Sequence, residues 1–409
     1  PDMPPLHTFQ ETVMENLKGV VRNENGNRGI LSLPTGAGKT RVTVQGLVEM
    51  IRDAELEGPI LWVAQTDELC EQSVRTWSEV WRAVGPNRAL AVSRFWGKND
   101  VEEVADSDQV VVATISKIDT LHRAESGTRH ERYEWLSAPT CVVIDEAHRS
   151  TTPEYTRLLK WLEIDGQRRS RPLVGLTATP FRGTNETETK RLVSRYGSKR
   201  IDDGAFEGDA YEELQESEVL AQVTHEVLAG QKIELSRSEL AHLKKFHRLP
   251  PEVEVRIGED RDRNRVLLDS ITKLPEDWPV LVFASSVSHA RSLAAVLTLR
   301  GKPSAAISSE TPTAARRFFV EEFRNGVVKV LTNYGVFTEG FDAPAVRAVY
   351  VGRPTYSPNL YQQMIGRGLR GPKNGGKPEC LLVDVADNIE NYQGQLAFTE
   401  FEGLWSGVY

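Results

Sequence analysis

The residues from Leu33 to Thr40, LPTGAGKT, have the composition of a loop that binds phosphate groups. Glycines within it let backbone N–H groups approach an anion without obstruction by side chains. Lys39 can reach the β- and γ-phosphates of a nucleotide, and the Thr40 hydroxyl can bind Mg²⁺. The usual pattern has Gly where Leu33 stands, but an apolar run at 29–33 precedes the loop and a helix-like stretch at 41–52 follows it. This strand–loop–helix context predicts a nucleotide-phosphate site made of Pro34, Thr35, Gly36, Ala37, Gly38, Lys39 and Thr40.

Two adjacent carboxylates end a second apolar run, which covers Cys141–Ile144. Asp145, at the tip of such a strand, can hold Mg²⁺ through water, and Glu146 can orient and deprotonate an attacking water. His148 is placed either to sense the γ-phosphate or to link this motif to the next one. The pair therefore predicts hydrolysis of a nucleoside triphosphate, with Thr40 and Asp145 as the Mg²⁺ ligands.

Short apolar runs recur along the chain, each bounded by polar or turn residues and separated by helix-like stretches. Such alternation is typical of parallel sheets with helices on both faces. The first series of expected strands comprises Gly29–Leu33, Ile60–Ala64, Gln109–Thr114, Cys141–Ile144 and Leu173–Thr177. The second series comprises Val280–Ala284, Pro303–Ile307, Val328–Thr332, Val346–Val351 and Glu379–Val385. The fold class predicted is α/β, with two tandem units.

The alternation breaks between these two series. Residues 201–219 contain eight acids and no Lys or Arg, Pro250 and Pro251 follow, and residues 259–265 are densely charged. We interpret the acidic run as a solvated face. The expected domains are therefore 1–200 and 263–393, with a partly helical connecting segment over 201–262 and a C-terminal extension over 394–409.

The composition of the 409 residues excludes several protein classes. With 39% hydrophobic and 26% charged residues the chain is typical of a globular protein, and its net charge of −8 argues against coating nucleic acid by bulk charge. We see no apolar run long enough to span a membrane and no secretory signal, and expect a cytoplasmic protein. Cys70, Cys141 and Cys380 are far apart in the sequence, so we expect buried thiols and no zinc site.

With these motifs in this order, the chain resembles the DEAD/DEAH-type superfamily 2 helicases and translocases over nearly its whole length. The resemblance implies two RecA-like domains that hydrolyse ATP with Mg²⁺ in a cleft between them and move on nucleic acid. The matching segments of the first unit are Leu6–Gln10 (the adenine-reading element, with Gln10 in the glutamine role), Trp62–Leu69 (motif Ia), Val112–Ser116 (motif Ib) and Leu176–Pro180 (motif III).

The second unit carries the remaining motifs. They are Val280–Ser286 (motif IV), Leu331–Asn333 with Thr338–Asp342 (motif V) and Gln363–Arg370 (motif VI). The resemblance adds Gly340 and Asp342 to the nucleotide-binding residues, and Gln363, Arg367 and Arg370 to the catalytic ones. An arginine supplied by the other domain stabilises the charge that develops on the transferring phosphoryl group. We take Arg370 as the first choice for this role.

Two departures from the family pattern concern nucleic-acid contacts. His7 stands where the first motif often has a basic residue, and Thr66-Asp67 stand where relatives often carry Arg. The sequences GLTATPFRG, FTEGFDAP and QMIGRGLRG resemble those of the branch that includes XPB-type, RadD-type and type I restriction motors. These motors act mostly on DNA.

Short polar side chains at strand ends are the candidate nucleic-acid contacts, because such groups bind phosphate and sugar without reading sequence. These candidates are Gln65, Thr114, Ser116, Ser285 and Thr332. Phe95–Lys98 is either a stacking platform for a base or a packed loop. The basic runs at 167–171 and 190–200 either flank the nucleic acid or are ordinary surface.

The function expected from these features is that of a DNA helicase or double-stranded DNA translocase in bacterial DNA repair or anti-phage defence. An RNA helicase with the same motor residues is one alternative. An ATP-gated nucleic-acid-binding scaffold is another. A partner protein or an additional domain outside this chain, such as a nuclease, stays open.

Overall fold

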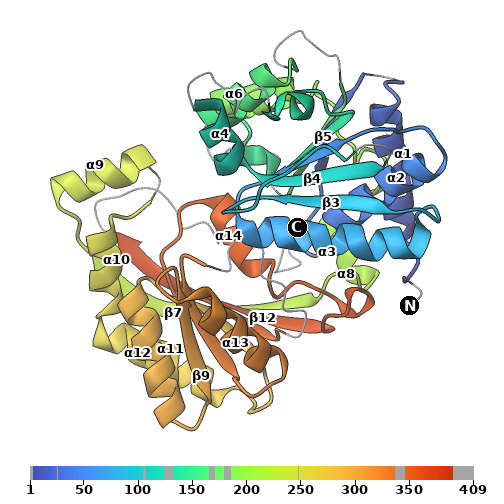
Figure 1. Ribbon diagram of the computed structural model, residues 1–409. Coiled ribbons are helices and arrows are strands. Elements are labelled where there is room, and N and C mark those ends of the chain that lie inside the picture. Colours follow the sequence, from blue (N-terminus) through green and yellow to red (C-terminus); the bar gives the residue numbers. More distant parts are fainter. Residues whose placement is uncertain are drawn as a thin grey trace. The chain divides into compact units, whose positions relative to one another are not determined.

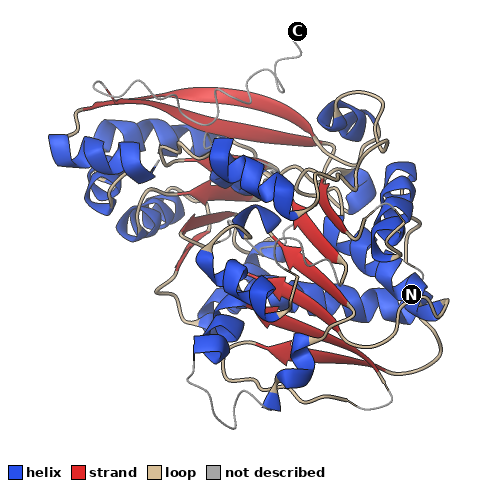
Figure 2. Ribbon diagram, turned by 90° about the horizontal axis from the view of Figure 1, so that it is seen from above, coloured by secondary structure: helices blue, strands red, loops and turns tan. Residues whose placement is uncertain are grey.

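The computed structural model describes residues 3–24, 26–104, 107–123, 132–164, 171–178, 186–246, 248–336 and 346–389. The chain divides into two compact units: Pro1–Pro34 with Gly38–Ala210, and Thr35–Ala37 with Tyr211–Tyr409 (Figure 1). Each unit contains one six-stranded sheet, with helices on either side of its strands (Figure 2). The predicted fold class, tandem α/β units with parallel sheets, is confirmed.

The first sheet has the strand order β1-β6-β5-β2-β4-β3, and all neighbouring strands are parallel. Its strands are β1 (Arg28–Ser32), β2 (Ile60–Ala64), β3 (Leu90–Phe95), β4 (Asp108–Thr114), β5 (Cys141–Asp145) and β6 (Leu173–Thr177). The central strands are buried on both faces and are therefore apolar up to their last residues, where β5 ends in Asp145 and β6 in Thr177. Five of the six agree with the expected runs, whereas β3, a half-exposed edge strand, was not anticipated.

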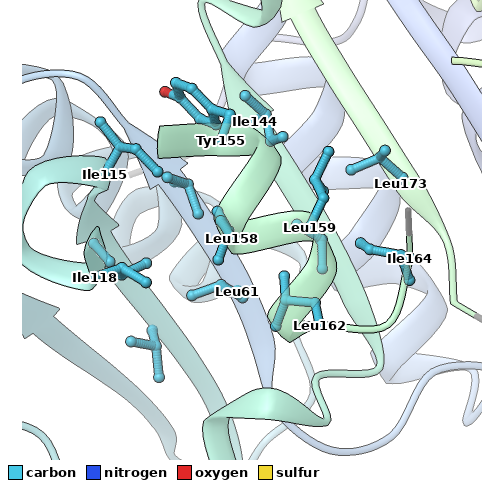
Figure 3. Packing of buried hydrophobic residues seen from close by; sticks show 14 of the residues in the cluster. Leu61, Ile115, Ile118, Ile144, Tyr155, Leu158, Leu159, Leu162, Ile164 and Leu173 are labelled. Atoms are coloured by element: carbon cyan, nitrogen blue, oxygen red, sulfur yellow. The ribbon is translucent and has the colours of Figure 1, made fainter. Parts of the chain in front are cut away.

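The helices of the first unit cover both faces of this sheet. They are α1 (Thr8–Val21), α2 (Lys39–Arg52), α3 (Asp67–Val84), α4 (Ile115–Arg123), α6 (Pro153–Trp161) and α7 (Glu186–Arg195), with short 3₁₀ turns at Glu134–Ser137 and Ala147–Arg149. Leu158 and Leu159 of α6 pack in one core cluster with Leu61 of β2 and Ile144 of β5 (Figure 3). Burial of such a side chain stabilises the fold by about 1.5–3 kcal/mol.

The second sheet has the order β7-β12-β11-β8-β10-β9 and is also parallel throughout. Its strands are β7 (Gln222–Ile233), β8 (Val280–Phe283), β9 (Ser304–Ser308), β10 (Val330–Tyr334), β11 (Ala348–Val351) and β12 (Glu379–Ile389). The helices are α8 (Ala210–Glu216), α9 (Arg237–Phe246), α10 (Pro251–Gly258), α11 (Arg261–Lys273), α12 (Val287–Leu299), α13 (Thr313–Arg324) and α14 (Pro358–Ile365), with a 3₁₀ turn at Pro372–Asn374.

Of the segment 201–262, expected to connect the domains, the residues up to Ala210 belong to the first unit and the rest contributes structure to the second. β7 is an edge strand of the second sheet and pairs with β12 from Gln222 to Ile233. The helices α9 and α10 share a small apolar cluster of their own with the end of β7. The second unit therefore begins at Tyr211, ahead of the expected boundary at 263.

Two further expectations from composition can be compared with the structure. The three cysteines are free and buried, and burial raises the pKa of the Cys141 and Cys380 thiols to about 12. Within the described part of the chain, none of the helices has both the length and the apolar character needed to cross a bilayer.

Candidate active site

The phosphate loop connects the end of β1 with the start of α2. Gly36 and Gly38 have φ angles of +95° and +87°, in the left-handed region that glycine adopts without steric cost. A Cβ atom on Gly38 would lie 2.5 Å from the Gln10 side-chain nitrogen. Because α2 begins directly after the loop, its unpaired N–H groups lie beside it, as an anion site requires.

Lys39 is held by the loop that it belongs to. Its Nζ donates to the Leu33 carbonyl at 2.8 Å and to the Pro34 carbonyl at 3.3 Å. A bound triphosphate would have to offer its oxygens in place of these two carbonyls. The ammonium group is therefore positioned at the loop before a nucleotide arrives.

Gln10 lies on α1 and packs against the same loop. The side chain is buried, its Oε1 accepts a hydrogen bond from the His7 backbone N–H at 3.1 Å, and its Nε2 is the atom that crowds Gly38. The amide thus joins the adenine-reading element to the phosphate loop. Its contact with adenine stays a prediction.

Asp145 and Glu146 form the end of β5. Asp145 is buried, and its Oδ1 accepts the Glu146 N–H at 3.0 Å. Glu146 has φ 52° and ψ 50°, a left-handed conformation that is uncommon for a residue with a side chain and costs of order 1–3 kcal/mol. Such strained residues cluster at functional sites, which agrees with the catalytic role expected for this carboxylate.

His148 links the acidic motif to the next strand. Its Nδ1 lies 3.2 Å from the Thr177 hydroxyl, at the end of β6, and 3.2 Å from Glu146 Oε2. Of the two roles considered for His148, the structure contains the link to motif III. The imidazole thus connects the residue expected to activate water with Thr177 of motif III.

Three neighbouring strands bring these groups to one edge of the first sheet. β6 pairs with β1 on one side and with β5 on the other, and all three run in the same direction. The phosphate loop follows β1, Thr177 ends β6 and Asp145 ends β5. Ligands of open parallel sheets bind at this carboxyl edge.

The donor set at this edge is suited to Mg²⁺. Thr40 offers a hydroxyl at the start of α2 and Asp145 a carboxylate, which are the oxygen ligands that Mg²⁺ prefers. Among the described residues, no group of three or more His, Cys, Asp or Glu could hold a metal by itself. This composition fits an ion that arrives with nucleotide phosphates and keeps several waters.

Motif VI lies in the second unit, on α14 and the loop after it. Ser357 caps the helix by accepting the Leu360 N–H at 3.4 Å. Gln363 is buried on the helix, and Arg367 Nε donates to the Gln363 carbonyl at 3.2 Å. Arg370 forms an isolated backbone bridge with Leu220, just before β7.

A buried carboxylate fixes this helix to the second sheet. Asp384 of β12 accepts hydrogen bonds at Oδ2 from the Tyr361 hydroxyl of α14 at 2.7 Å and lies 2.8 Å from His225 Nε2 of β7. Sequence reasoning missed all three residues, since only Tyr361 adjoins a motif and nothing in the sequence pairs it with Asp384. They position the helix that carries Gln363.

The candidate contacts in motifs Ia and Ib are partly engaged within the first unit. The Gln65 amide donates to the Tyr155 hydroxyl at 2.8 Å, and the Thr114 hydroxyl accepts from the Lys117 N–H at 3.4 Å. Ser116 is exposed. Thr66, one of the departures noted above, caps α3 by accepting the Leu69 N–H at 3.3 Å. Helix capping therefore explains why a threonine stands at position 66.

Two of the predicted nucleic-acid contacts need correction. Ser285 and Thr332 are fully buried: the Ser285 hydroxyl lies 2.9 Å from His289 Nδ1, and the Thr332 hydroxyl donates to the Ala290 carbonyl at 2.8 Å. Both hydroxyls are used inside the second unit, so neither is available to a phosphate in this structure. Their polarity reflects buried hydrogen bonding at the strand ends.

The aromatic pair Phe95-Trp96 is a packed loop and not an open platform. Both side chains are buried, and the Phe95 ring lies 5.4 Å from that of Tyr133 and 5.4 Å from Lys117 Nζ. In the basic run at 190–200, Arg195 donates to the Thr156 hydroxyl at 3.2 Å and Arg200 pairs with Asp202. Gly340, Asp342, the end of motif III and residues 167–170 lie outside the described residues.

Comparison with protein families matches both units. Residues 4–182 match the family of the type III restriction enzyme res subunit, and residues 262–371 match the helicase conserved C-terminal domain. The chain is 26% identical over 389 residues to IRC3 of Saccharomyces cerevisiae, which is named as an ATP-dependent helicase. This alignment covers 93% of the chain and 51% of IRC3, so the chain spans about half the length of that relative.

Solved structures share the fold of the whole chain. A fragment named as the HsdR subunit of a type I restriction enzyme from Vibrio vulnificus has a TM-score of 0.64 at 18% identity, covering 100% of this chain and 68% of the fragment. Dbp5 of S. cerevisiae bound to RNA and ADP BeF3 has a TM-score of 0.61 at 14% identity, covering 97% and 88%. Two tandem RecA-like domains are thus the shared architecture.

Proposed function

Because this chain belongs to the superfamily 2 helicases and is an ATP-hydrolysing enzyme of that group, we propose that it is a motor on DNA. It acts either as a DNA helicase or as a double-stranded DNA translocase. For the pathway we propose bacterial DNA repair or defence against phage.

The observation that carries the proposal is the set of three parallel strand ends in the first sheet. The phosphate loop after β1, Thr177 at the end of β6 and Asp145 at the end of β5 lie at one edge. His148 contacts both Thr177 and Glu146, the residue that follows Asp145. A change at the γ-phosphate would alter the environment of Glu146 and His148, and through Thr177 it would reach motif III. This arrangement supports a motor whose nucleotide state is transmitted beyond the nucleotide site.

Each residue of the site has a role in this proposal. Backbone N–H groups of the loop and the Lys39 ammonium bind the phosphates, and Glu146 orients the attacking water and accepts its proton. Mg²⁺, held by Thr40 and Asp145, would supply positive charge to the phosphate oxygens. Arg367 and Arg370 stabilise the charge of the transition state, which stays a prediction that alanine substitution of each would test.

DNA is favoured by the family match and by the branch that motifs V and VI resemble. The first unit matches a restriction-enzyme subunit over residues 4–182, and restriction enzymes act on DNA. A structural neighbour is also named as a restriction subunit. A nuclease or another partner domain outside this chain is consistent with that setting. Localisation in the cytoplasm is part of the same proposal.

An RNA helicase is the second candidate. The structure of Dbp5 with RNA aligns with 97% of this chain, and at 14% identity that likeness concerns the fold alone. The residues of the ATP site are compatible with either DNA or RNA as the nucleic acid. The substrate therefore has to be decided by experiment.

The test is the rate of ATP hydrolysis with equal masses of duplex DNA, single-stranded DNA and RNA. We expect stimulation by DNA, and we expect it to vanish in Glu146→Gln, which keeps the shape of the side chain but cannot accept the proton. A preference for duplex would favour translocation over unwinding. Stimulation by RNA alone would overturn the DNA proposal in favour of the second candidate. Absence of turnover with all three would favour the ATP-gated scaffold.

A further inference from the structure

The helix α9 exposes a group of basic and aromatic side chains that belongs to none of the motifs. Its sequence and that of the following turn, RSELAHLKKFHR, contain four Lys or Arg and a single acid in a chain with net charge −8. Phe246 is 56% exposed at the end of the helix. Lys245 Nζ lies 5.1 Å from its ring centroid, the His242 ring centroid lies 4.7 Å from it, and Lys244 is exposed. We refer to Lys244, Lys245 and Phe246 as the α9 platform.

The opposite side of α9 packs against the second unit, so the helix is held in place while Phe246 stays exposed. Leu243 is fully buried in a cluster with Leu235, Leu249 and Val253, and Leu240 packs against it. These residues join α9 to the end of β7 and to α10 (Figure 1). The lone acid, Glu239, is turned toward α10, where it accepts a hydrogen bond from Arg256 at 3.2 Å. The acid is thereby neutralised by a partner, and the platform keeps its positive charge.

The helix α10 is in turn fixed to the carboxyl ends of three strands of the second sheet. Glu254 is buried and accepts a hydrogen bond from the Tyr334 hydroxyl, at the end of β10, at 2.6 Å. Arg353, just after β11, pairs with the same carboxylate. Gly258 comes so close to the end of β8 that a Cβ atom there would lie 2.7 Å from the Ser285 hydroxyl.

These attachments link α9, through α10, to the strand ends that carry motifs IV and V. Ser285 belongs to motif IV, and Tyr334 directly follows the Leu331–Asn333 part of motif V. The guanidinium of Arg353 also lies 5.3 Å from the Tyr334 ring centroid. The link from α9 to these motifs therefore runs through buried contacts and not through a free loop.

We propose that the α9 platform binds a single-stranded segment of the nucleic acid, with Phe246 stacked on an unpaired base and Lys244 and Lys245 on the adjacent phosphates. This proposal rests on the proposed nucleic-acid motor function. An exposed ring beside an ammonium group, with a second lysine next in the sequence, has the two features that sequence-independent single-strand binding uses, namely a stacking surface and positive charge. A base in a duplex is already stacked on its neighbours, so the ring selects unpaired bases.

The charge and size of the platform favour nucleic acid over a protein partner. A protein interface of standard size has an apolar centre with several buried anchors. On α9, the exposed Phe246 ring follows two lysines and packs against the His242 ring, and the other large apolar side chains of the helix are directed into the cluster with α10. Positive charge around one ring complements a phosphate backbone with bases.

The experiment measures binding of the full chain to a fluorescent single-stranded oligonucleotide and to a blunt duplex of equal length. Phe246→Ala is expected to weaken single-strand binding about 10-fold, the loss typical of one base–aromatic stack, with little effect on the duplex. Phe318→Ala is the control, since Phe318 is 58% exposed on α13, where Glu321 and Glu322 follow one helical turn later and offset the charge of Arg316 and Arg317. It is expected to keep the wild-type dissociation constants.

A second variant tests the charged part of the platform. The double substitution Lys244→Ala/Lys245→Ala removes two phosphate contacts, so the slope of log K against log salt for the single strand should flatten by about 1.4. Both lysines are exposed, so we expect the double substitution to leave the fold intact. Thermal unfolding of each variant provides the check.

The outcomes separate this inference from the proposed function. If the wild-type chain binds neither DNA nor RNA, the nucleic-acid motor fails and the platform fails with it. If the wild-type chain binds and Phe246→Ala binds equally well, the platform alone is refuted. Equal losses of duplex and single-strand binding in Phe246→Ala would refute stacking on an unpaired base.

Discussion

The buried ion pair between Arg263 of α11 and Asp387 of β12 gives a quantitative test of what holds the second unit together. Both side chains are fully buried. Arg263 Nε donates to Asp387 Oδ1 at 2.9 Å and its Nη2 donates to Oδ2 at 2.7 Å. The same Nη2 donates to the Gly352 carbonyl at 3.1 Å, and Asp387 Oδ1 accepts the Gln231 N–H at 3.1 Å. Helix α11 is thereby tied to β12, β7 and the end of β11.

The substitution Arg263→Met would remove the cation and leave a buried carboxylate with the Gln231 N–H among its remaining donors. Breaking one side of such a pair typically costs about 3–5 kcal/mol, because the other charge stays buried and uncompensated. In Arg263→Met/Asp387→Asn the charge is gone and the amide oxygen can still accept from Gln231. The Gly352 carbonyl loses its donor, which costs about 1 kcal/mol. The double variant should therefore be more stable than Arg263→Met by about 2–4 kcal/mol.

The assay is urea denaturation of the full chain, followed by hydrogen exchange of peptides from β8 and β11. Exchange of the β8 and β11 peptides shows whether the loss of stability lies in the second unit. Peptides from β2 and β5, in the first unit, serve as the internal control. A loss below about 1 kcal/mol in Arg263→Met would refute the reasoning. So would a double variant that is no more stable than this single one.

Three other predictions concern groups described above. Burial, with a contribution from the Arg263 charge, lowers the pKa of His289 to about 3 from 6.5, so the unfolded chain binds the extra proton between these values. Stability should fall by up to about 1.4 kcal/mol per pH unit as the pH drops below 6.5, and His289→Gln should reduce that slope in urea titrations. Thr177→Val removes the hydroxyl from His148 and should lower the nucleic-acid-stimulated kcat about fivefold, if the contact contributes about 1 kcal/mol in the transition state; an unchanged kcat would contradict the coupling role. Tyr361→Phe removes a donor from Asp384 and should lower kcat with little change in the KM for ATP, whereas a change confined to KM would contradict a positioning role.

Much of the first sheet could be predicted because its central strands are buried on both faces. Ile60–Ala64 and Leu173–Thr177 agree with the expected ranges to the residue. The edge strands β3 and β7 could not be recognised in the same way. In β7, exposed and half-buried positions alternate and polar residues such as Thr224 and Glu226 interrupt the pattern, so the segment resembles a connection. Edge strands face solvent on one side and lack the continuous apolar signal.

The residues of the nucleotide site were easier to anticipate than the nucleic-acid contacts. Gly36, Gly38 and Lys39 follow from local chain geometry, since the conformation and the charge are needed within one short loop. Thr332 and Ser285 sit in motifs of the same kind, yet their hydroxyls satisfy buried carbonyl and imidazole groups. Whether a strand-end hydroxyl faces inward depends on what packs above the strand. Here α12 does so, and the motif sequence does not encode it.

The pairing of β7 with β12 has a consequence for how the second unit is made. His225 and Asp384 meet although they are 159 residues apart, so the edge of the sheet is completed by two strands that are distant in the sequence. During synthesis β7 leaves the ribosome long before its partner strand exists, and such a distant pairing forms slowly. The frequent polar residues of β7, which make it hard to recognise as a strand from sequence, keep it soluble until β12 has been synthesised. A fragment begun at residue 263 would lack β7 and expose the long edge of β12 to pairing with other chains.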